Sequence, residues 1–168
     1  MSFFSSGVEY AIHSLMCMVD DSGNGREMSV REIAELHGMP YDYLGKVFTR
    51  LAKAGLVSSL EGRNGGYQLA RSPAEITIRD VALAIDENKT LFDCREVRQR
   101  MAVFDSVIPV WACDTPCSVR LVMDEAQRQM YESLARHTIL SLTRRMLKKV
   151  PDSYPIQISE WLTQRRSG

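Results

Sequence analysis

Apolar residues recur at helical spacing in four segments of the first half of the chain. The pattern predicts helices at about residues 8–20, 30–37, 40–54 and 77–85. Ser29, followed three residues later by Glu32, has the spacing of a capping box, and Gly55 stands where a helix would end. The third helix is expected to bury its apolar positions, Tyr43, Leu44, Val47, Phe48 and Leu51.

The second and third predicted helices are joined only by Gly38, Met39 and Pro40, which is typical of a helix-turn-helix. Two short strands follow, at 56–60 and 67–70, on either side of a glycine-rich tip at 61–66. A hairpin directly after the third helix is the wing of a winged helix. The expected fold is therefore mainly α with one small β-hairpin.

The second half of the chain divides differently. The pattern weakens at 89–118, which reads as an irregular loop with a helical turn near 96–101, and long apolar rows return at 119–147. A terminal helix of that length usually packs on a second copy of the chain. We expect a winged helix-turn-helix domain at 1–86, a cysteine-bearing loop at 87–118, a dimerisation helix at 119–150 and a tail at 151–168.

Composition narrows the function. The 168 residues carry 21 basic and 21 acidic side chains, so the formal net charge is zero. DNA binding would therefore need a local patch rather than a general basic coat. The sequence shows no signal peptide, no membrane span and no phosphate loop or nucleophile–base motif. These features favour a cytoplasmic protein that is not an enzyme.

A DNA interface is expected on the third helix and the wing. The exposed side of the helix and the hairpin tip together offer polar, basic and glycine residues that suit groove and phosphate contacts, namely Tyr41, Asp42, Lys46, Arg50, Arg63, Asn64, Gly65 and Gly66. The same residues would also suit a solvated helix face and an ordinary hairpin. Winged helices can also serve as protein-interaction modules, so the fold alone does not fix the function.

The segment Gly55–Ala70 resembles the wing of the Rrf-type transcription regulators, the family that includes IscR and NsrR. Residues 43–44 and 48–51 resemble that family's recognition helix, and residues 76–81 its fourth helix. The resemblance extends over about residues 7–147. It implies a homodimeric winged-helix repressor or activator that binds double-stranded DNA at a palindromic operator, with the long helix forming the dimer.

Two further segments, Gly7–His13 and Cys94–Cys117, resemble the RsrR-like redox-sensing subgroup. That resemblance implies a 2Fe–2S cluster held across the dimer. Its ligands would be Glu9 and His13 of one subunit and Cys113 and Cys117 of the other, with Cys94 nearby and not a ligand. Eighteen residues separate Cys94 from Cys113, unlike the closely spaced three-cysteine sites of the 4Fe–4S members. The recognition helix also differs from that of IscR, so the operator sequence of that relative cannot be assigned to this chain.

The donor chemistry is compatible with that reading. Glu9 and His13 are four residues apart and therefore share one helix face, and thiolates with imidazole are known iron–sulfur ligands. Glu9 and His13 could equally form a surface ion pair, and Cys113 and Cys117 could be idle thiols or a reversible disulfide. Cys17 reads as a buried small residue.

Two other functions remain open on the sequence. One is a cluster-free regulator of the same family that senses thiol oxidation or a small ligand. The other is a zinc- or thiol-bearing protein-interaction module that does not bind DNA.

Overall fold

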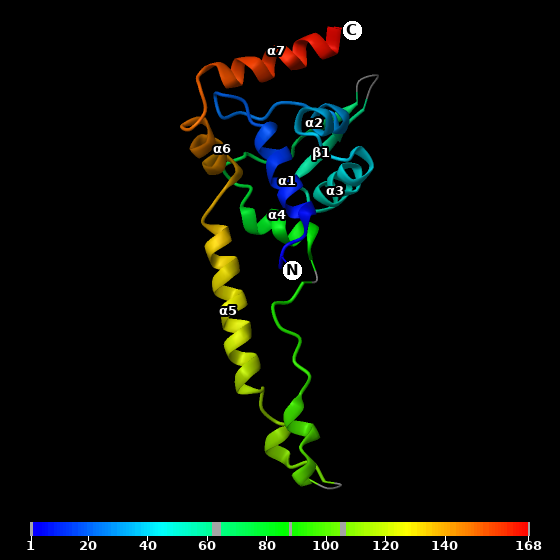
Figure 1. The fold of residues 1–168 in the computed structure, drawn as a ribbon, viewed down its shortest axis with the longest axis vertical. Coiled ribbons are helices and arrows are strands. Elements are labelled where there is room, and N and C mark those ends of the chain that lie inside the picture. The colour runs from blue at the N-terminus through cyan, green and yellow to red at the C-terminus, as the bar shows by residue number, and fades with distance from the viewer. Residues whose placement is uncertain (1, 62–64, 88, 105–106, 168) are drawn as a thin grey trace. The chain divides into compact units, whose positions relative to one another are not determined.

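The computed structural model describes residues 2–61, 65–87, 89–104 and 107–167 (Figure 1). The chain forms two compact units, Met1–Glu87 with Leu134–Gly168, and Asn88–Ser133. The first unit contains the winged helix and the last two helices. The second contains the cysteine-bearing loop and most of one long helix.

In the first unit, α1 (Ser6–Cys17) packs against α3 (Tyr41–Lys53), α4 (Ile78–Ile85) and α6 (Ile139–Leu147), and α2 (Val30–His37) packs against α3. The core lies where these helices meet, around the fully buried side chains of Leu15, Phe48 and Leu51. The four helices predicted in the first half of the chain are confirmed, although α1 begins two residues earlier and ends three residues earlier than expected.

The helix-turn-helix forms as its local signals predict. The Ser29 hydroxyl accepts a hydrogen bond from the Glu32 N–H at 3.1 Å, and the Glu32 carboxylate accepts one from the Ser29 N–H at 2.6 Å. This confirms the capping box. Gly38 ends α2 with φ of 65°, a left-handed conformation that glycine adopts without a Cβ penalty. The turn therefore sets the direction in which α3 leaves.

The wing is a two-stranded antiparallel hairpin of β1 (Val57–Leu60) and β2 (Gly66–Leu69). Val57 pairs with Leu69 and Leu60 pairs with Gly66, and Met28 adds an isolated bridge to Tyr67. A Cβ on Gly66 would lie 2.9 Å from the Met28 carbonyl oxygen. Glycine at this position is therefore required by the chain's own backbone.

Tyr43 is not buried as the apolar pattern predicted. Its side chain is 39% exposed, and its ring makes an edge contact with Tyr10 at a centroid distance of 5.8 Å. The other apolar positions of α3 are buried. Tyr43 lies on the border of the apolar stripe, where its ring packs on α1 and a Cβ on Gly7 would lie 2.9 Å from its hydroxyl oxygen.

The long helix predicted at 119–147 is two helices, α5 (Ser118–Ala135) and α6. The Ile78 N–H donates to the His137 carbonyl at 2.8 Å, and the Ile139 N–H donates to the Ile76 carbonyl at 2.9 Å. Thr138 then starts α6 with a capping box to Ser141. Pairing of this stretch with the chain just before α4 replaces the helical hydrogen bonds, so the continuous-helix prediction is wrong here.

The segment assigned as a tail contains a further helix, α7 (Ser153–Ser167). Pro155 stands in its first turn, where proline costs no helical hydrogen bond. Leu162 is buried and anchors α7 to the first unit. The C-terminal end of α7, in red at the top of Figure 1, reaches α2 through a hydrogen bond from Arg166 to Glu32.

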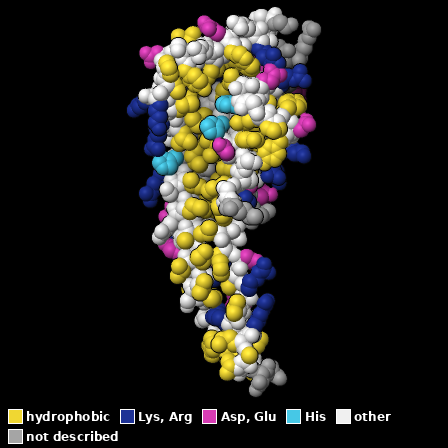
Figure 2. Space-filling view, in the orientation of Figure 1, with side chains coloured by type: hydrophobic (Ala, Val, Ile, Leu, Met, Phe, Trp, Pro, Cys, Tyr) yellow, Lys and Arg dark blue, Asp and Glu magenta, His cyan; other side chains and the backbone are white. Residues whose placement is uncertain are grey.

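The described residues of the second unit form the short 3₁₀ helices η1 (Val97–Arg100), η2 (Ala102–Phe104) and η3 (Val110–Ala112), and α5 as far as its last turn. The expected helical turn near 96–101 is confirmed as η1. Few side chains here are buried, and Figure 2 shows hydrophobic side chains spread over the visible face of this unit. No helix within the described residues is long and apolar enough to cross a membrane.

Candidate nucleic-acid interface and metal ligands

A groove of about 1380 Å³ runs between the start of α2, the exposed side of α3 and the hairpin. Five of the residues predicted for DNA binding line it: Tyr41, Asp42, Lys46, Gly65 and Gly66. They come from α3 and from the hairpin that directly follows it. The fold thus brings together the helix and hairpin residues that the sequence could place only by pattern.

Arg50 lies elsewhere. Its Nη1 donates to the Ile85 carbonyl at 2.8 Å, so the guanidinium caps the last turn of α4 instead of lining the groove. Basic side chains near a helix C-terminus commonly satisfy its free carbonyls. Arg63 and Asn64 lie outside the described residues.

The groove also contains residues that the sequence analysis did not select. Arg31 of α2 places its guanidinium carbon 5.9 Å from the centre of the Tyr41 ring, and Thr49 lies one turn after Gly45 on α3. Arg165 and Arg166 of α7 also line it. The arginine pair was visible in the sequence, but nothing local indicated that α7 folds back onto α2.

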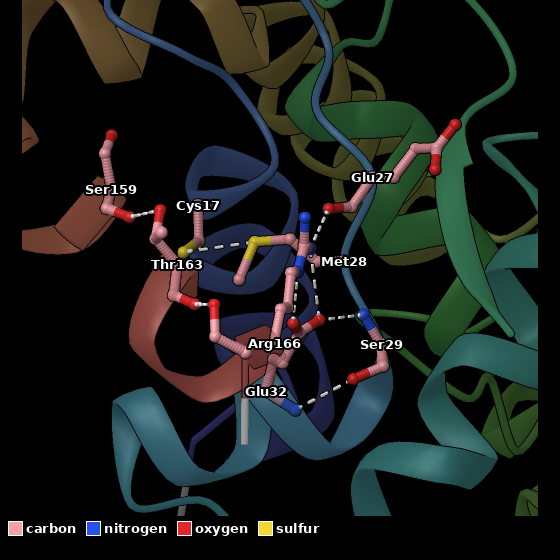
Figure 3. Close-up of polar contacts among 9 residues, drawn as sticks. Cys17, Glu27, Met28, Ser29, Glu32, Ser159, Thr163 and Arg166 are labelled. Carbon is pink, nitrogen blue, oxygen red and sulfur yellow. Dashed lines mark hydrogen bonds and ion pairs between the residues drawn. The ribbon is translucent and has the colours of Figure 1, made fainter. Parts of the chain in front are cut away.

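Glu32 connects α7 with α2. Its carboxylate accepts a hydrogen bond from Arg166 Nε at 2.7 Å as well as the capping bond from Ser29 (Figure 3). Burial alone would raise the pKa of Glu32, but the bonds from Arg166 and Ser29 outweigh it and hold the pKa below its usual value. Glu32 is therefore a carboxylate, and Arg166 balances its charge.

Glu9 and His13 lie one turn apart on α1, and both are exposed. They line a pocket of about 420 Å³ between α1 and the N-terminal residues. The His37 ring lies near that of His13, with centroids 6.2 Å apart. Burial, and then the charge of His13, lower the pKa of His37. α1 thus presents a carboxylate and an imidazole on one accessible face.

Cys113 and Cys117 belong to the second unit, at the end of η3 and just before α5. Cys113 is exposed and Cys117 is half-buried. Backbone N–H groups of Arg120 and Val119, in the first turn of α5, bond the Cys117 sulfur and lower its pKa. Both thiols are therefore accessible, and the helix start favours the thiolate at Cys117.

The cysteine-bearing loop is held together by Arg98. Its Nη2 donates to Glu96 at 3.1 Å and to the Thr115 carbonyl at 2.7 Å, which joins the η1 segment to the stretch between Cys113 and Cys117. Cys94 lies beside the same carboxylate, with 3.6 Å between its Sγ and Glu96 Oε1.

Cys17 differs from the other three cysteines. Its Sγ lies 3.7 Å from the Met28 Sδ, inside the first unit, and burial raises its pKa to about 11. It is a neutral thiol that packs as a small apolar side chain. Within the described residues, no three His, Cys, Asp or Glu side chains come together as a possible metal site. Glu9 and His13 form one candidate pair of donors in the first unit, and Cys113 and Cys117 form another in the second.

This architecture and its sequence are similar to those of known proteins. The model of the Rrf2 family, described as an iron-dependent transcriptional regulator, matches residues 4–145. The chain is 33% identical to protein rrf2 of Nitratidesulfovibrio vulgaris over 73% of this chain and 75% of that protein. It is 30% identical to the HTH-type transcriptional regulator NsrR of Shouchella clausii over 68% of this chain and 70% of that protein.

Among solved structures, CymR, the global cysteine regulator of B. subtilis, superposes with a TM-score of 0.60 at 21% identity, covering 86% of this chain and 98% of CymR. That likeness confirms the winged-helix fold. The relatives are named as transcriptional regulators and not as enzymes. The chain therefore belongs to the Rrf2 family of transcriptional regulators.

Proposed function

We propose that this chain is a cytoplasmic, homodimeric regulator whose α3 and wing bind a palindromic operator, and whose DNA binding depends on a 2Fe–2S cluster bridging the two subunits. The groove between α3 and the hairpin carries the DNA-binding part of the proposal, because Tyr41, Lys46 and Gly65 meet there. A recognition helix with an adjacent wing can contact the major groove and the neighbouring phosphates together.

Homodimerisation is supported by the second unit. α5 has 18 residues, and none of those is buried within its own chain. Val119 and Val122, one turn apart near its start and therefore on one face, are each more than half exposed. Covering such an apolar face with a second copy lowers the free energy of the assembly. A palindromic operator also requires two DNA-binding domains about one helical turn apart.

A cluster is supported by the donors themselves. Cys113 and Cys117 are accessible thiols, and Cys117 is held toward the thiolate form. Glu9 and His13 offer an oxygen and a nitrogen donor on one face of α1. Two thiolates with an imidazole and a carboxylate make four ligands, the number that a 2Fe–2S cluster needs. The pairing of α1 of one protomer with the loop of the other is part of the proposal.

The chain provides a route from such a site to DNA. α1 packs directly against α3, and the cysteine-bearing loop leads into α5. When bound, the cluster would supply a one-electron change in charge between these two elements. A shift of α1 relative to α5 alters the spacing of the paired recognition helices, which an operator tolerates poorly.

The first test is an anaerobic purification with an absorbance spectrum and an iron count. We expect visible absorbance that Cys113→Ala or Cys117→Ala removes, together with the redox dependence of operator binding. Cys17→Ala is the matched control and should leave the spectrum unchanged. A colourless, iron-free protein after cluster reconstitution would rule out the cluster.

Mixing two variants tests ligation across the dimer. Protomers with Glu9→Ala and His13→Ala are combined with protomers carrying Cys113→Ala and Cys117→Ala. Random pairing makes half of the dimers mixed, each with one complete set of ligands, so about a quarter of the wild-type absorbance should return. If ligation occurred within one protomer, the mixture would stay colourless.

One alternative has its own support in the structure. The lowered pKa of Cys117 also suits a cluster-free regulator that responds to thiol oxidation. This alternative would be favoured if peroxide changed operator binding by the iron-free protein and Cys117→Ala abolished that change.

A further inference from the structure

The groove beside α3 is completed by a helix from the opposite end of the sequence. Arg165 and Arg166, in the last turn of α7, line it together with Lys46 of α3 and residues of the wing. The winged-helix fold explains why α3 and the hairpin line this groove. It does not explain why two arginines of α7 line it as well. The question is what these two side chains do at the DNA-facing groove.

α7 is docked in a definite position. Arg166 donates from Nε to Glu32 at 2.7 Å and from Nη2 to the Glu27 carbonyl at 2.7 Å, as Figure 3 shows. Arg165 forms an ion pair with Glu35 and lies over the Trp161 ring, with 5.8 Å from its guanidinium carbon to the ring centre. Both guanidinium groups are thus oriented by α2 and by α7 itself.

The charges of the groove depend on these two arginines. Without them, the described lining has two cations, Arg31 and Lys46, against four carboxylates, Glu27, Glu32, Asp42 and Glu61. Duplex DNA carries one negative charge per about 1.7 Å of its axis, so such a lining would repel it. With Arg165 and Arg166, the described cations and carboxylates are equal in number.

The arginines retain the means to bind phosphate. Their side chains are 44% and 48% exposed. The hydrogen bonds of Arg166 within the described residues use Nε and Nη2, which leaves its Nη1 amino group for an outside acceptor. Arginine has five N–H donors in a fixed fork, so one group can bind a carboxylate and a phosphate oxygen together.

We infer that Arg165 and Arg166 of α7 are part of the DNA-binding surface and contact the phosphate backbone beside α3. The inference rests on the proposed DNA binding. α7 is then a third element of the DNA interface, after the recognition helix and the wing. It contributes affinity for any sequence and not base readout, because phosphates carry no sequence information.

The test measures binding of a duplex from upstream of the protein's own gene by fluorescence anisotropy, over a series of salt concentrations. The full-length double variant Arg165→Ala/Arg166→Ala is compared with Lys148→Ala/Lys149→Ala, which removes the same charge at exposed positions that do not line the groove. Each lost phosphate contact lowers the slope of log affinity against log salt by about 0.9, so two contacts per protomer predict a decrease of about 3.6 for a dimer.

We expect the arginine variant to bind at least tenfold more weakly at low salt with the shallower slope, and the lysine control to keep the wild-type slope. Arg165→Lys/Arg166→Lys should retain most of the slope, because it keeps the charge. If the arginines only held α7 in place, the alanine variant would also bind more weakly, but the lysine variant would not restore the affinity.

Three results would overturn the inference. An arginine variant with wild-type affinity and slope would show that α7 does not contact DNA, and tighter binding would show that α7 covers the groove instead. If the wild-type protein binds no promoter fragment, the proposed DNA-binding function fails, and the inference fails with it.

Discussion

The two units of this chain differ in how far their apolar side chains are buried. In the first unit, large residues such as Phe48, Leu15 and Ile33 are fully buried among the packed helices. In the second, Val103, Val107 and Val110 are each at least 70% exposed, and α5 has no buried residue. The first unit is stabilised by the packing of its own core, whereas the second leaves many of its apolar side chains exposed.

The same contrast appears in the polar groups. The first unit satisfies its helix starts with capping boxes at Ser29, Thr77 and Thr138. In the second unit, side chains instead link irregular segments: Arg98 donates to the Thr115 carbonyl, and Gln99 donates to the Ala112 carbonyl. A region with few buried side chains opens at a lower free energy than a packed core.

The largest expected effect comes from a charge on α5. Val122→Asp places a carboxylate on the exposed apolar face, and burying it in a dimer would be strongly unfavourable. We expect the dimer dissociation constant to rise about 100-fold or more, measured by sedimentation. Ile156→Asp, at an apolar residue of α7 in the first unit that is also more than half exposed, is the control and should leave the dimer intact. A Val122→Asp protein that stays dimeric at the same concentration would contradict the assignment of α5.

The next effect compares cysteines of the two units. In the metal-free protein, Cys117 should react with iodoacetamide at least about tenfold faster than Cys17, because backbone N–H groups lower its pKa while burial raises that of Cys17 to about 11. Peptide mass spectrometry over time gives both rates. Equal rates would mean that Cys17 is as accessible to the reagent as Cys117, and therefore that the first unit opens as readily as the second.

A smaller effect tests the boundary between α5 and α6. Thr138→Ala removes the hydroxyl that caps α6 and should lower the free energy of unfolding by about 1 kcal/mol. Thermal unfolding measures this, and Thr138→Ser should retain wild-type stability. An unchanged melting temperature for the alanine variant would indicate that the helix runs on through this position.

The smallest effect is a pH dependence at Glu32. Its folded pKa lies below the usual value of 4.5, so its ion pair with Arg166 contributes full stability above that pH and loses it as the pH falls through the folded pKa. The stability difference between wild type and Glu32→Gln should therefore shrink on acidification below about pH 4.5. A difference that stays constant to low pH would mean that the pair contributes nothing.

Sequence alone predicted the parts of the fold that depend on local signals. The capping box at Ser29, the stop at Gly55 and the hairpin were all readable because each arises within a few residues. The break before α6 was not, because the apolar spacing continues through it. The pairing of residues 76–78 with 137–139 that ends α5 depends on contacts distant in the sequence.

The candidate interface shows the same limit. Tyr41, Lys46 and Gly65 were found because a recognition helix and a wing have a fixed order along the chain. Arg50 was selected for its charge and its place on α3, yet it bonds the end of α4. Arg166 was passed over because its contact with Glu32 spans most of the chain.

The most direct test of the account is the stoichiometry of the complex with DNA. Native mass spectrometry of the full-length protein mixed with a duplex from upstream of its own gene should show two chains bound to one duplex. That result is expected if α5 joins two copies and each contributes one α3 and one wing. A single chain on the duplex, or free protein beside free DNA, would contradict it.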